Sequence, residues 1–226
     1  MHQDTARLLP VPPADSRVAA RALLLNCLSS DYAEMWAAGW QDAFLDDGWL
    51  SADPHLTQWA DHLAQGKDWR WETPLRSALD RRQALVELDV LAARALGLSL
   101  DDLLLMYRVS FPTMRKYDTE TFFDQKGRVV FTSLKGGGGL PNTPKRSQRN
   151  CTVLRGGEVI EQDIALGWKD VLERGWNDQP GIEIRHTIYD QVTADEPSPH
   201  TVSYIAPFFR KDREADYREV WETLEK

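Results

Sequence analysis

Cysteine is scarce in this chain, with two among 226 residues, at positions 27 and 151. Disulfide frameworks and zinc clusters need several cysteines at short, regular spacings, and two isolated ones provide neither. The sequence therefore excludes the small disulfide-rich secreted proteins and the zinc-cluster proteins. We expect Cys27 and Cys151 to be ordinary thiols.

Long apolar runs are also lacking. No stretch approaches the roughly 18 consecutive apolar residues that a membrane-spanning helix needs, and residues 1–13 have no apolar core of the kind found in secretory signals. The composition, 42% apolar with nine tryptophans, nevertheless supplies enough material for a hydrophobic core. We therefore expect a soluble, cytoplasmic, globular protein without a membrane partner.

The common catalytic motifs are absent as well. The chain has no Gly-x-Ser-x-Gly elbow, no Gly-x-x-x-x-Gly-Lys-Ser/Thr phosphate loop and no His-Glu-x-x-His pair. Its histidines are isolated, which favours surface or hydrogen-bonded core positions over a metal site with three or four convergent ligands; they are His2, His55, His62, His186 and His200. The acidic run at residues 158–163 has its nearest lysine in the following helix, which disfavours a metal-dependent nuclease. We predict no catalytic residue, no bound metal and no cofactor.

Basic residues are outnumbered by acidic ones, 27 to 35, yet residues 125–157 contain no acidic residue at all. The seven basic residues of this segment are Lys126, Arg128, Lys135, Lys145, Arg146, Arg149 and Arg155. Because the whole chain carries a net charge of −8, the remainder carries about −15. Such segregation predicts one surface that faces a polyanion, and we identify these seven residues as candidate nucleic-acid contacts.

Four consecutive glycines at positions 136–139, followed by a polar run, lie within this segment. The composition predicts a flexible basic loop over residues 134–150 that contributes nothing to a core. Glycine amides can bind phosphate, but no clear helix start follows this run, which favours a flexible tip over a phosphate site.

The first half of the sequence predicts helices. Their expected spans are residues 17–28 with Ser16 as N-cap, 31–45, a short helix within 56–65, 74–96, 99–111 and 113–117. Tyr32, Met35, Trp36, Trp40 and Phe44 recur at helical spacing and are expected to form a core stripe. Ser99 and Asp102 form a near capping box.

Strands are predicted mainly in the second half. The expected strands are residues 121–123, 128–133, 151–154, 158–161, 182–189 and 202–205, with helices at 163–174 and 212–224. The pattern indicates an α+β protein with a helical N-terminal half and a mixed C-terminal half built on short antiparallel hairpins. We divide the chain into a helical region, 1–118, and an α+β region, 119–226, with one integrated domain as the alternative.

The helices on either side of residues 97–99 are predicted to form a helical hairpin. A more specific interpretation is a DNA-binding helix-turn-helix. The second helix, however, offers Asp101, Asp102 and mostly leucines, whereas a recognition helix needs polar or basic side chains directed at base edges. The sequence therefore disfavours this interpretation.

Several stretches resemble a known family. Tyr-Arg-Val-Ser-Phe-Pro at 107–112 and Gly-Arg-Val-Val-Phe-Thr at 127–132, with the helix at 82–89 and residues 207–217, resemble the C-terminal region of adenine-specific DNA methylases. These are enzymes of bacterial restriction and phage-defence systems, of the type IIG-like, phage-growth-limitation or DISARM type. The resemblance covers most of the chain. The glycine-rich cofactor motif and the Asn-Pro-Pro-Tyr/Phe catalytic motif of such enzymes are both missing.

The resemblance implies a non-catalytic, methyltransferase-associated accessory or DNA-recognition subunit in antiviral defence or restriction-modification, with DNA and a larger defence-system protein as partners. The alternative is an adaptor that docks on that enzyme without touching DNA. Exposed aromatics would then supply the anchors, and Trp49, Trp59, Trp69 and Trp71 are candidates.

Overall fold

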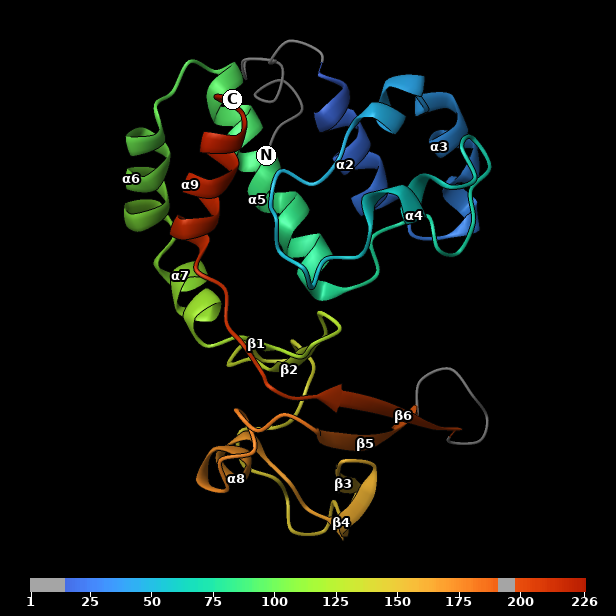
Figure 1. The fold of residues 1–226 in the computed structure, drawn as a ribbon, viewed down its shortest axis with the longest axis vertical. Coiled ribbons are helices and arrows are strands. Elements are labelled where there is room, and N and C mark those ends of the chain that lie inside the picture. The colour runs from blue at the N-terminus through green and yellow to red at the C-terminus, as the bar shows by residue number, and fades with distance from the viewer. Residues whose placement is uncertain (1–14, 191–197) are drawn as a thin grey trace, which may run out of the picture. The chain divides into compact units, whose positions relative to one another are not determined.

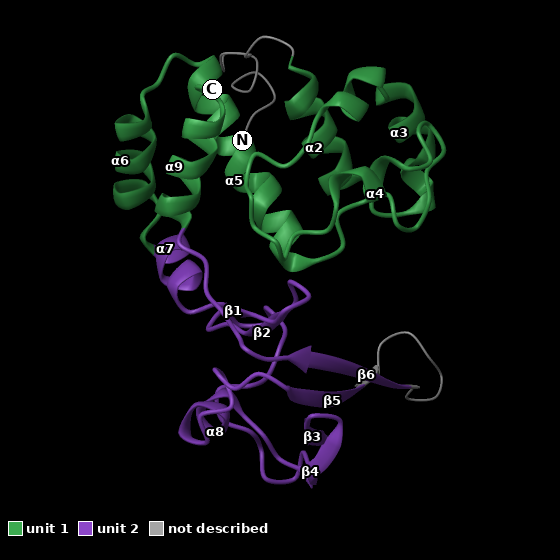
Figure 2. Ribbon diagram, viewed as in Figure 1, with its two compact units in different colours: residues 1–112, 213–226 green, residues 113–212 purple. Residues whose placement is uncertain are grey.

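The computed structural model describes residues 15–190 and 198–226 and has the expected α+β class. Helices dominate its first half, and two small antiparallel sheets lie in its second half (Figure 1). The chain divides into two compact units, coloured separately in Figure 2. Unit 1 comprises the residues up to Pro112 together with residues 213–226, and unit 2 comprises residues 113–212.

Unit 1 is helical. Its elements are α2 (Ser16–Asn26), α3 (Ala33–Gly39), α4 (Trp59–Leu63), α5 (Ala78–Ala95), α6 (Leu100–Ser110) and α9 (Arg213–Thr223), with 3₁₀ turns η1 (Ser30–Tyr32) and η2 (Asp42–Asp46). Asp15, rather than the expected Ser16, caps α2, because its carboxylate accepts the backbone N–H of Arg17. The capping box predicted for α6 is confirmed: Ser99 and Asp102 each accept the other's backbone N–H.

The single helix expected over residues 31–45 is wrong, since the chain leaves the helical conformation between Gly39 and Asp42. Gly39 ends α3 where a Cβ would lie 2.9 Å from the Leu23 side chain, so α2 and α3 approach closely at this point. Only part of the expected stripe is buried. Trp36 and Phe44 are inaccessible to solvent, whereas Tyr32 and Met35 are 46% and 44% exposed.

A buried charge network joins α2 to α5. The guanidinium of Arg21 donates to Glu87 at 2.5 Å and to Asp47 at 2.6 Å, and also to the carbonyl of Gly48. It lies 4.7 Å from the ring of Trp59. These contacts fix the chain that follows η2 against two helices.

The last helix, α9, packs on α5 and α6 and so belongs to unit 1, although it follows the residues of unit 2 in the sequence. Arg82 of α5 pairs with Asp216 at 2.5 Å, and the hydroxyl of Tyr217 donates to Asp89 at 2.6 Å. The expected region 119–226 thus contributes to both units, because these partners lie far away in the sequence.

Unit 2 contains both sheets. Its elements are α7 (Pro112–Thr119, which begins at the last residue of unit 1), β1 (Phe122–Phe123), β2 (Val129–Phe131), β3 (Cys151–Arg155), β4 (Glu158–Ile164), α8 (Trp168–Glu173), β5 (Ile182–Asp190) and β6 (Ser198–Ile205). β1 pairs with β2, and the second sheet has the order β4-β3-β5-β6. The two predicted hairpins are confirmed.

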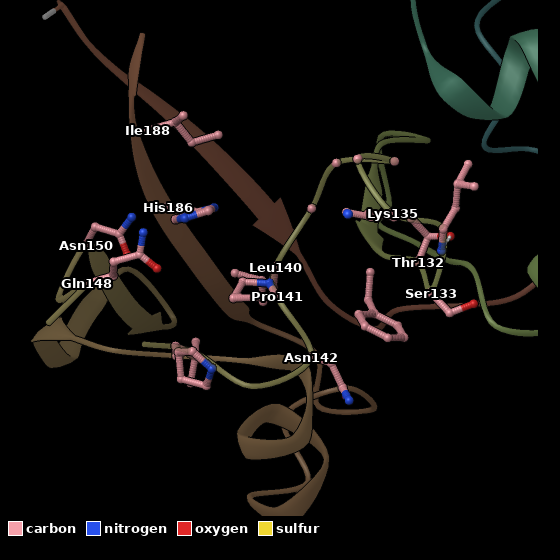
Figure 3. Close-up of a pocket in the computed structure, with 18 of the residues that line it drawn as sticks. Thr132, Ser133, Lys135, Leu140, Pro141, Asn142, Gln148, Asn150, His186 and Ile188 are labelled. Carbon is pink, nitrogen blue, oxygen red and sulfur yellow. Dashed lines mark hydrogen bonds between the residues drawn. The ribbon is translucent and has the colours of Figure 1, made fainter. Parts of the chain in front are cut away.

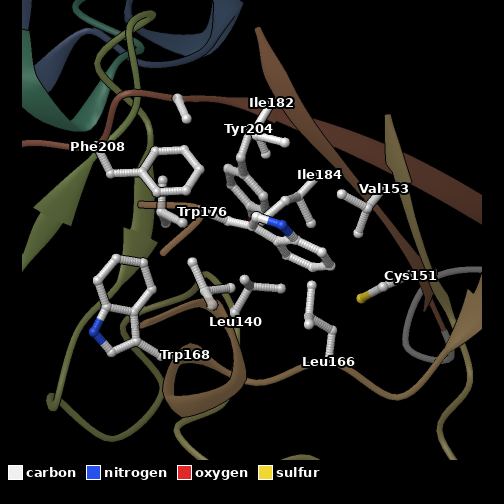
Figure 4. Packing of buried hydrophobic residues seen from close by; sticks show 13 residues of the cluster. Leu140, Cys151, Val153, Leu166, Trp168, Trp176, Ile182, Ile184, Tyr204 and Phe208 are labelled. Carbon is white, nitrogen blue, oxygen red and sulfur yellow. The ribbon is translucent and has the colours of Figure 1, made fainter. Parts of the chain in front are cut away.

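The helix expected at 163–174 begins only at Trp168, since residues 158–164 pair with β3. Gly167 is its N-cap, and the Asp170 carboxylate accepts the Gly167 N–H at 2.8 Å. Below α8, Ile182 and Ile184 of β5 pack in a core with Trp168, Trp176 and their neighbours (Figure 4).

In the part of the chain that the structure describes, no helix combines the length and the apolar character that crossing a membrane requires.

Candidate functional site

The segment of residues 134–150 is packed into unit 2 through its centre. Leu140 is 2% exposed and belongs to the core cluster beneath α8 (Figure 4). Its N–H donates to the carbonyl of Val130 at 2.6 Å. The expectation that this segment contributes nothing to a core is therefore wrong: one leucine within a polar run is enough to anchor it.

At two of the four positions in the glycine run, the structure leaves no room for a side chain. A Cβ at Gly139 would overlap the backbone carbonyl of Val130, and one at Gly137 would lie 2.5 Å from the Thr132 side chain. Gly139 also has a positive φ of 80°, a conformation that other residues rarely adopt. The glycines thus let the segment lie directly against β2.

The carbonyls after Leu140 meet the start of α8. The carbonyl of Pro141 accepts the N–H of Trp168 at 2.8 Å, and that of Asn142 accepts the N–H of Lys169 at 3.2 Å. These N–H groups are among those that a helix leaves unpaired at its first turn. The segment is consequently held between β2 and α8, and residues 143–149 extend from this attachment at the surface.

This segment and one face of β5 enclose a pocket of about 1170 Å³ (Figure 3). Its polar lining consists mainly of hydroxyls and amides, from Thr132, Ser133, Asn142, Ser147, Gln148 and Asn150. Two cations, Lys135 and Arg149, also line it, and its apolar wall includes Leu140 and Ile188. In Figure 3, His186 and Gln148 lie on one side of Leu140, and Lys135 lies on the other.

His186 is the buried polar residue of the pocket. Side chains of β5 alternate between its faces, so the stripe Ile182, Ile184, His186 and Ile188 leads from the core into the pocket. His186 is 9% exposed, and its Nδ1 is buried without a hydrogen-bond partner. Burial lowers the pKa of the imidazole below its ordinary value, which favours the neutral ring at pH 7.

Sequence reasoning missed this residue. The sequence did contain a signal for it, since every second residue from 182 to 188 is isoleucine except His186. A polar side chain on the core face of a strand needs a hydrogen-bond partner or a function. The expectation of hydrogen-bonded core histidines is wrong for His186. It holds in part for His62, whose Nδ1 lies 3.2 Å from the carbonyl of Glu72 while its Nε2 is buried without a partner. His55 is half-buried beside Asp53 and His200 is exposed, while His2 lies outside the described residues.

The seven predicted basic residues do not all gather at one place. Lys135 and Arg149 line the pocket, and Lys145 and Arg146 are exposed on the same segment. The others lie outside the segment: Lys126 and Arg128 follow β1, and Arg155 ends β3.

Three of these seven basic side chains donate hydrogen bonds to other groups of the protein. Arg128 donates to the fully buried Asp124 at 2.7 and 3.0 Å, Arg155 to Gln179 at 3.0 Å, and Arg149 through Nε to the carbonyl of Asp163 at 2.6 Å. Among the described residues, Lys135, Lys145 and Arg146 have neither an ion pair nor a side-chain hydrogen bond.

The acidic run at 158–163 and the two thiols offer no reactive centre in the described residues. Glu161 pairs with Arg174 at 2.5 Å, and no three His, Cys, Asp or Glu side chains of the described ranges converge as metal ligands. Cys151 is 1% exposed, and burial raises the pKa of its thiol to about 11, so it is not a thiolate nucleophile at pH 7.

Comparison with protein-family models, with curated proteins and with solved structures finds no match to this chain.

Proposed function

We propose that the protein is a non-catalytic, cytoplasmic accessory or DNA-recognition subunit of a bacterial phage-defence or restriction-modification system. In this proposal it works with a larger enzyme of that system and contacts DNA through residues 134–150. The observation that supports DNA contact is the set of cations without internal partners, Lys135, Lys145 and Arg146, around a pocket rich in amide and hydroxyl groups. Phosphates bind such cations, and amides hydrogen-bond to sugars and base edges.

The distribution of charge between the two units also favours DNA contact at residues 134–150. Unit 2 contains 14 basic and 14 acidic residues, whereas the rest of the chain contains 13 and 21. The whole net charge of −8 therefore lies in unit 1. Because an acidic surface repels DNA, contact is expected only where cations are concentrated and not already neutralised.

We restrict the proposed contacts to the cations of residues 134–150. Arg128 is neutralised by the buried Asp124, Lys126 lies in the turn between β1 and β2, and Arg155 lies on the β3–β4 hairpin. We therefore assign phosphate contact to Lys135, Lys145, Arg146 and Arg149. About four such contacts would make the logarithm of the binding constant fall with that of the salt concentration at a slope of roughly −3 to −4.

Titration of a labelled duplex by fluorescence anisotropy, at low and at near-physiological salt, tests the proposal. The variant Lys145→Glu/Arg146→Glu/Arg149→Glu should lose the salt-sensitive binding of the wild-type protein. The matched control is Lys67→Glu/Lys116→Glu/Lys169→Glu, which has the same change in net charge at exposed lysines outside the segment. Equal loss in both variants would mean that only net charge matters, and no binding by the wild type would refute DNA contact.

A protein adaptor is the second candidate, and α6 carries the observation that favours it. Leu105, Met106 and Val109 are 58%, 47% and 69% exposed on this helix. Such an apolar helix face fits a groove on a partner protein. The four tryptophans considered as anchors contribute less: Trp59 is buried, Trp49 and Trp69 are half-buried, and only Trp71 is 64% exposed.

Co-purification with a co-expressed defence-system methylase separates the two candidates. An adaptor should lose its partner in Leu105→Glu/Val109→Glu and keep it when the three basic residues are reversed. A DNA-contacting subunit should retain duplex binding in the α6 variant and lose it in the charge-reversed one.

A further inference from the structure

The pocket beside residues 134–150 offers more than phosphate contacts, and its chemistry allows the ligand to be specified. We infer that it receives one unpaired nucleotide, with the base toward His186 and a phosphate toward Lys135 and the glycine run. The inference rests on the proposed contact between this segment and nucleic acid. It adds a preference for unpaired over duplex strands, which that proposal does not contain.

His186 supplies a buried polar group on the wall of the pocket. The Nδ1 of His186 is buried without a partner on a face of β5 that is otherwise isoleucine, and the residue lines the pocket. A neutral imidazole presents one donor and one acceptor nitrogen, as the edges of nucleobases do. Because Nδ1 is inaccessible to solvent, Nε2 is the ring nitrogen that a ligand in the pocket can reach, and its hydrogen bond to a ligand would be made in a largely dry environment.

The walls of the pocket combine an amide with apolar side chains. Gln148 lies near His186 in Figure 3 and has no side-chain hydrogen bond among the described residues, so its amide is available to a base. Leu140 and Ile188 provide apolar surface for the faces of a base and a ribose. Ligand pockets in proteins combine these two elements, mostly apolar walls and a few placed polar groups.

Lys135 and the glycine run offer groups that can bind a phosphate. The backbone N–H groups of Gly136, Gly138 and Gly139 have no hydrogen-bond partner among the described residues, and Lys135 precedes them. The N–H of Gly137, between them, donates to the carbonyl of Leu134 at 3.0 Å. Free backbone amides close together in the chain and next to an ammonium group can bind an anion. In Figure 3, Lys135 lies across Leu140 from His186, so the anion-binding and base-binding groups are on different sides of the pocket.

The burial of His186 favours unpaired over paired strands. Only 9% of the residue is exposed, and base edges that remain stacked inside a duplex are held in the helix and cannot turn toward it. An unpaired base can enter the pocket, whose volume of about 1170 Å³ exceeds that of one nucleotide.

The test compares a fluorescein-labelled single strand of about 12 nucleotides with a duplex of the same length, by anisotropy at low salt. The wild-type protein should bind the single strand at least about tenfold more tightly. His186→Phe removes the polar edge but keeps a flat ring, and Ser147→Trp fills the pocket from an exposed rim position. His186→Phe should weaken single-strand binding about tenfold, the effect of one lost hydrogen-bonded contact. Ser147→Trp should weaken it at least as much by excluding the base, and both variants should leave duplex binding nearly unchanged.

His55→Phe is the matched control, because it makes the same substitution in unit 1 and should not alter binding. Circular dichroism establishes that each variant is folded, and Ser147→Trp carries the test if His186→Phe does not fold. Competition by free thymidine monophosphate identifies a single nucleotide as the ligand. If it fails to compete while the variants still lose affinity, the nucleotide must belong to a strand with neighbouring phosphates.

Two results overturn the inference in different ways. Equal affinity for single strand and duplex, unchanged in both pocket variants, refutes the nucleotide pocket and leaves the proposed DNA contact standing. Absence of salt-sensitive binding to either nucleic acid refutes both.

Discussion

Arg21 carries a positive charge that is inaccessible to solvent and is balanced by two carboxylates. Replacing it by Met would leave Glu87, which is also inaccessible, and Asp47 buried without their cation. Removing one partner of a buried ion pair typically costs about 3–5 kcal/mol. We predict that Arg21→Met lowers the free energy of unfolding by this amount in urea denaturation followed by tryptophan fluorescence.

Arg17, one turn earlier on α2, provides the control. Its guanidinium pairs with Asp15 at 2.8 Å, but the side chain is 41% exposed. Exposed pairs contribute about 0–1 kcal/mol, so Arg17→Met should change stability little. Similar losses in the two variants would show that the Arg21 network does not hold unit 1 together.

His186 gives unit 2 a defined response to acid. Burial lowers the pKa of this imidazole, so below its ordinary value of about 6.5 the unfolded chain takes up a proton that the folded chain resists. Stability is therefore complete above that pH and falls as the pH decreases. The other ionisable side chains that line the pocket are Lys135 and Arg149. Cys151, opposite His186 on β3, has a pKa of about 11.

Between about pH 7.5 and pH 5.5, we predict that the wild-type protein loses more unfolding free energy than His186→Phe, by at most about 1.4 kcal/mol, the value of one pH unit below the ordinary pKa. Urea denaturation at both pH values measures the difference. Parallel curves for the two proteins would contradict a neutral, buried His186.

At the residue scale, contacts between residues close in the sequence could be predicted, whereas contacts between residues far apart in the sequence could not. Ser99 and Asp102 meet three residues apart, so the capping box was readable. The pairing of Arg128 with Asp124, four residues earlier, was also within reach, but the cation was assigned to nucleic acid because all the basic residues of the segment were treated alike. The alternation of β5 places His186 on the same face as Ile182 and Ile184, but the sequence does not show that its Nδ1 lacks a hydrogen-bond partner, since that depends on every group packed around it.

At the scale of elements, the attachment of residues 134–150 to β2 is testable through its glycines. Gly138 and Gly139 both have positive φ, 87° and 80°. A Cβ at Gly138 would meet open space, whereas one at Gly139 would overlap the Val130 carbonyl. We predict that Gly138→Ala costs about 1 kcal/mol, from its φ alone, and that Gly139→Ala costs at least about 2 kcal/mol more.

Thermal and urea unfolding of the two variants measure this difference. If residues 134–150 formed a loop without packing contacts, both substitutions would change the free energy of unfolding by equal and small amounts. Such a result would contradict the packing of Leu140 and, with it, the wall of the pocket.

Most helices and strands could be predicted from the sequence, because the residues that form hairpin turns and helix N-termini are neighbours in the chain. The turn between β1 and β2 is held by Asp124, whose carboxylate accepts the N–H groups of Lys126 and Arg128. The course of residues 134–150 was not predictable, since it depends on Val130 and on the first turn of α8, which meet it only in the fold. The same applies to the start of α8, displaced by the pairing of β4.

At the scale of the whole molecule, unit 2 is inserted into unit 1 between α6 and α9. Arg108 in the last turn of α6 donates to Glu214 in the first turn of α9 at 2.9 Å, so the two ends of the insertion leave unit 1 close together. A flexible linker of about eight residues would span this gap. We predict that a chain in which such a linker replaces residues 113–212 keeps helical circular dichroism and a cooperative unfolding transition.

Deletion of residues 213–226 from that chain is the control, because it removes the buried Tyr217 and Val220 from unit 1. It should abolish the cooperative transition. Loss of the transition in the linker chain itself would show that unit 1 depends on unit 2 for its fold.

The insertion also sets the order in which the molecule can be completed during translation. The ribosome makes α5 and α6, then all of unit 2, and only afterwards α9, which supplies Asp216 and Tyr217 to α5. At about 5–20 residues per second, the 100 residues of unit 2 keep the docking face of α5 open for roughly 5–20 seconds. Unit 2 can fold as it emerges, whereas unit 1, although begun first, must wait for its last helix and is the part of the nascent chain with the greater need for a chaperone.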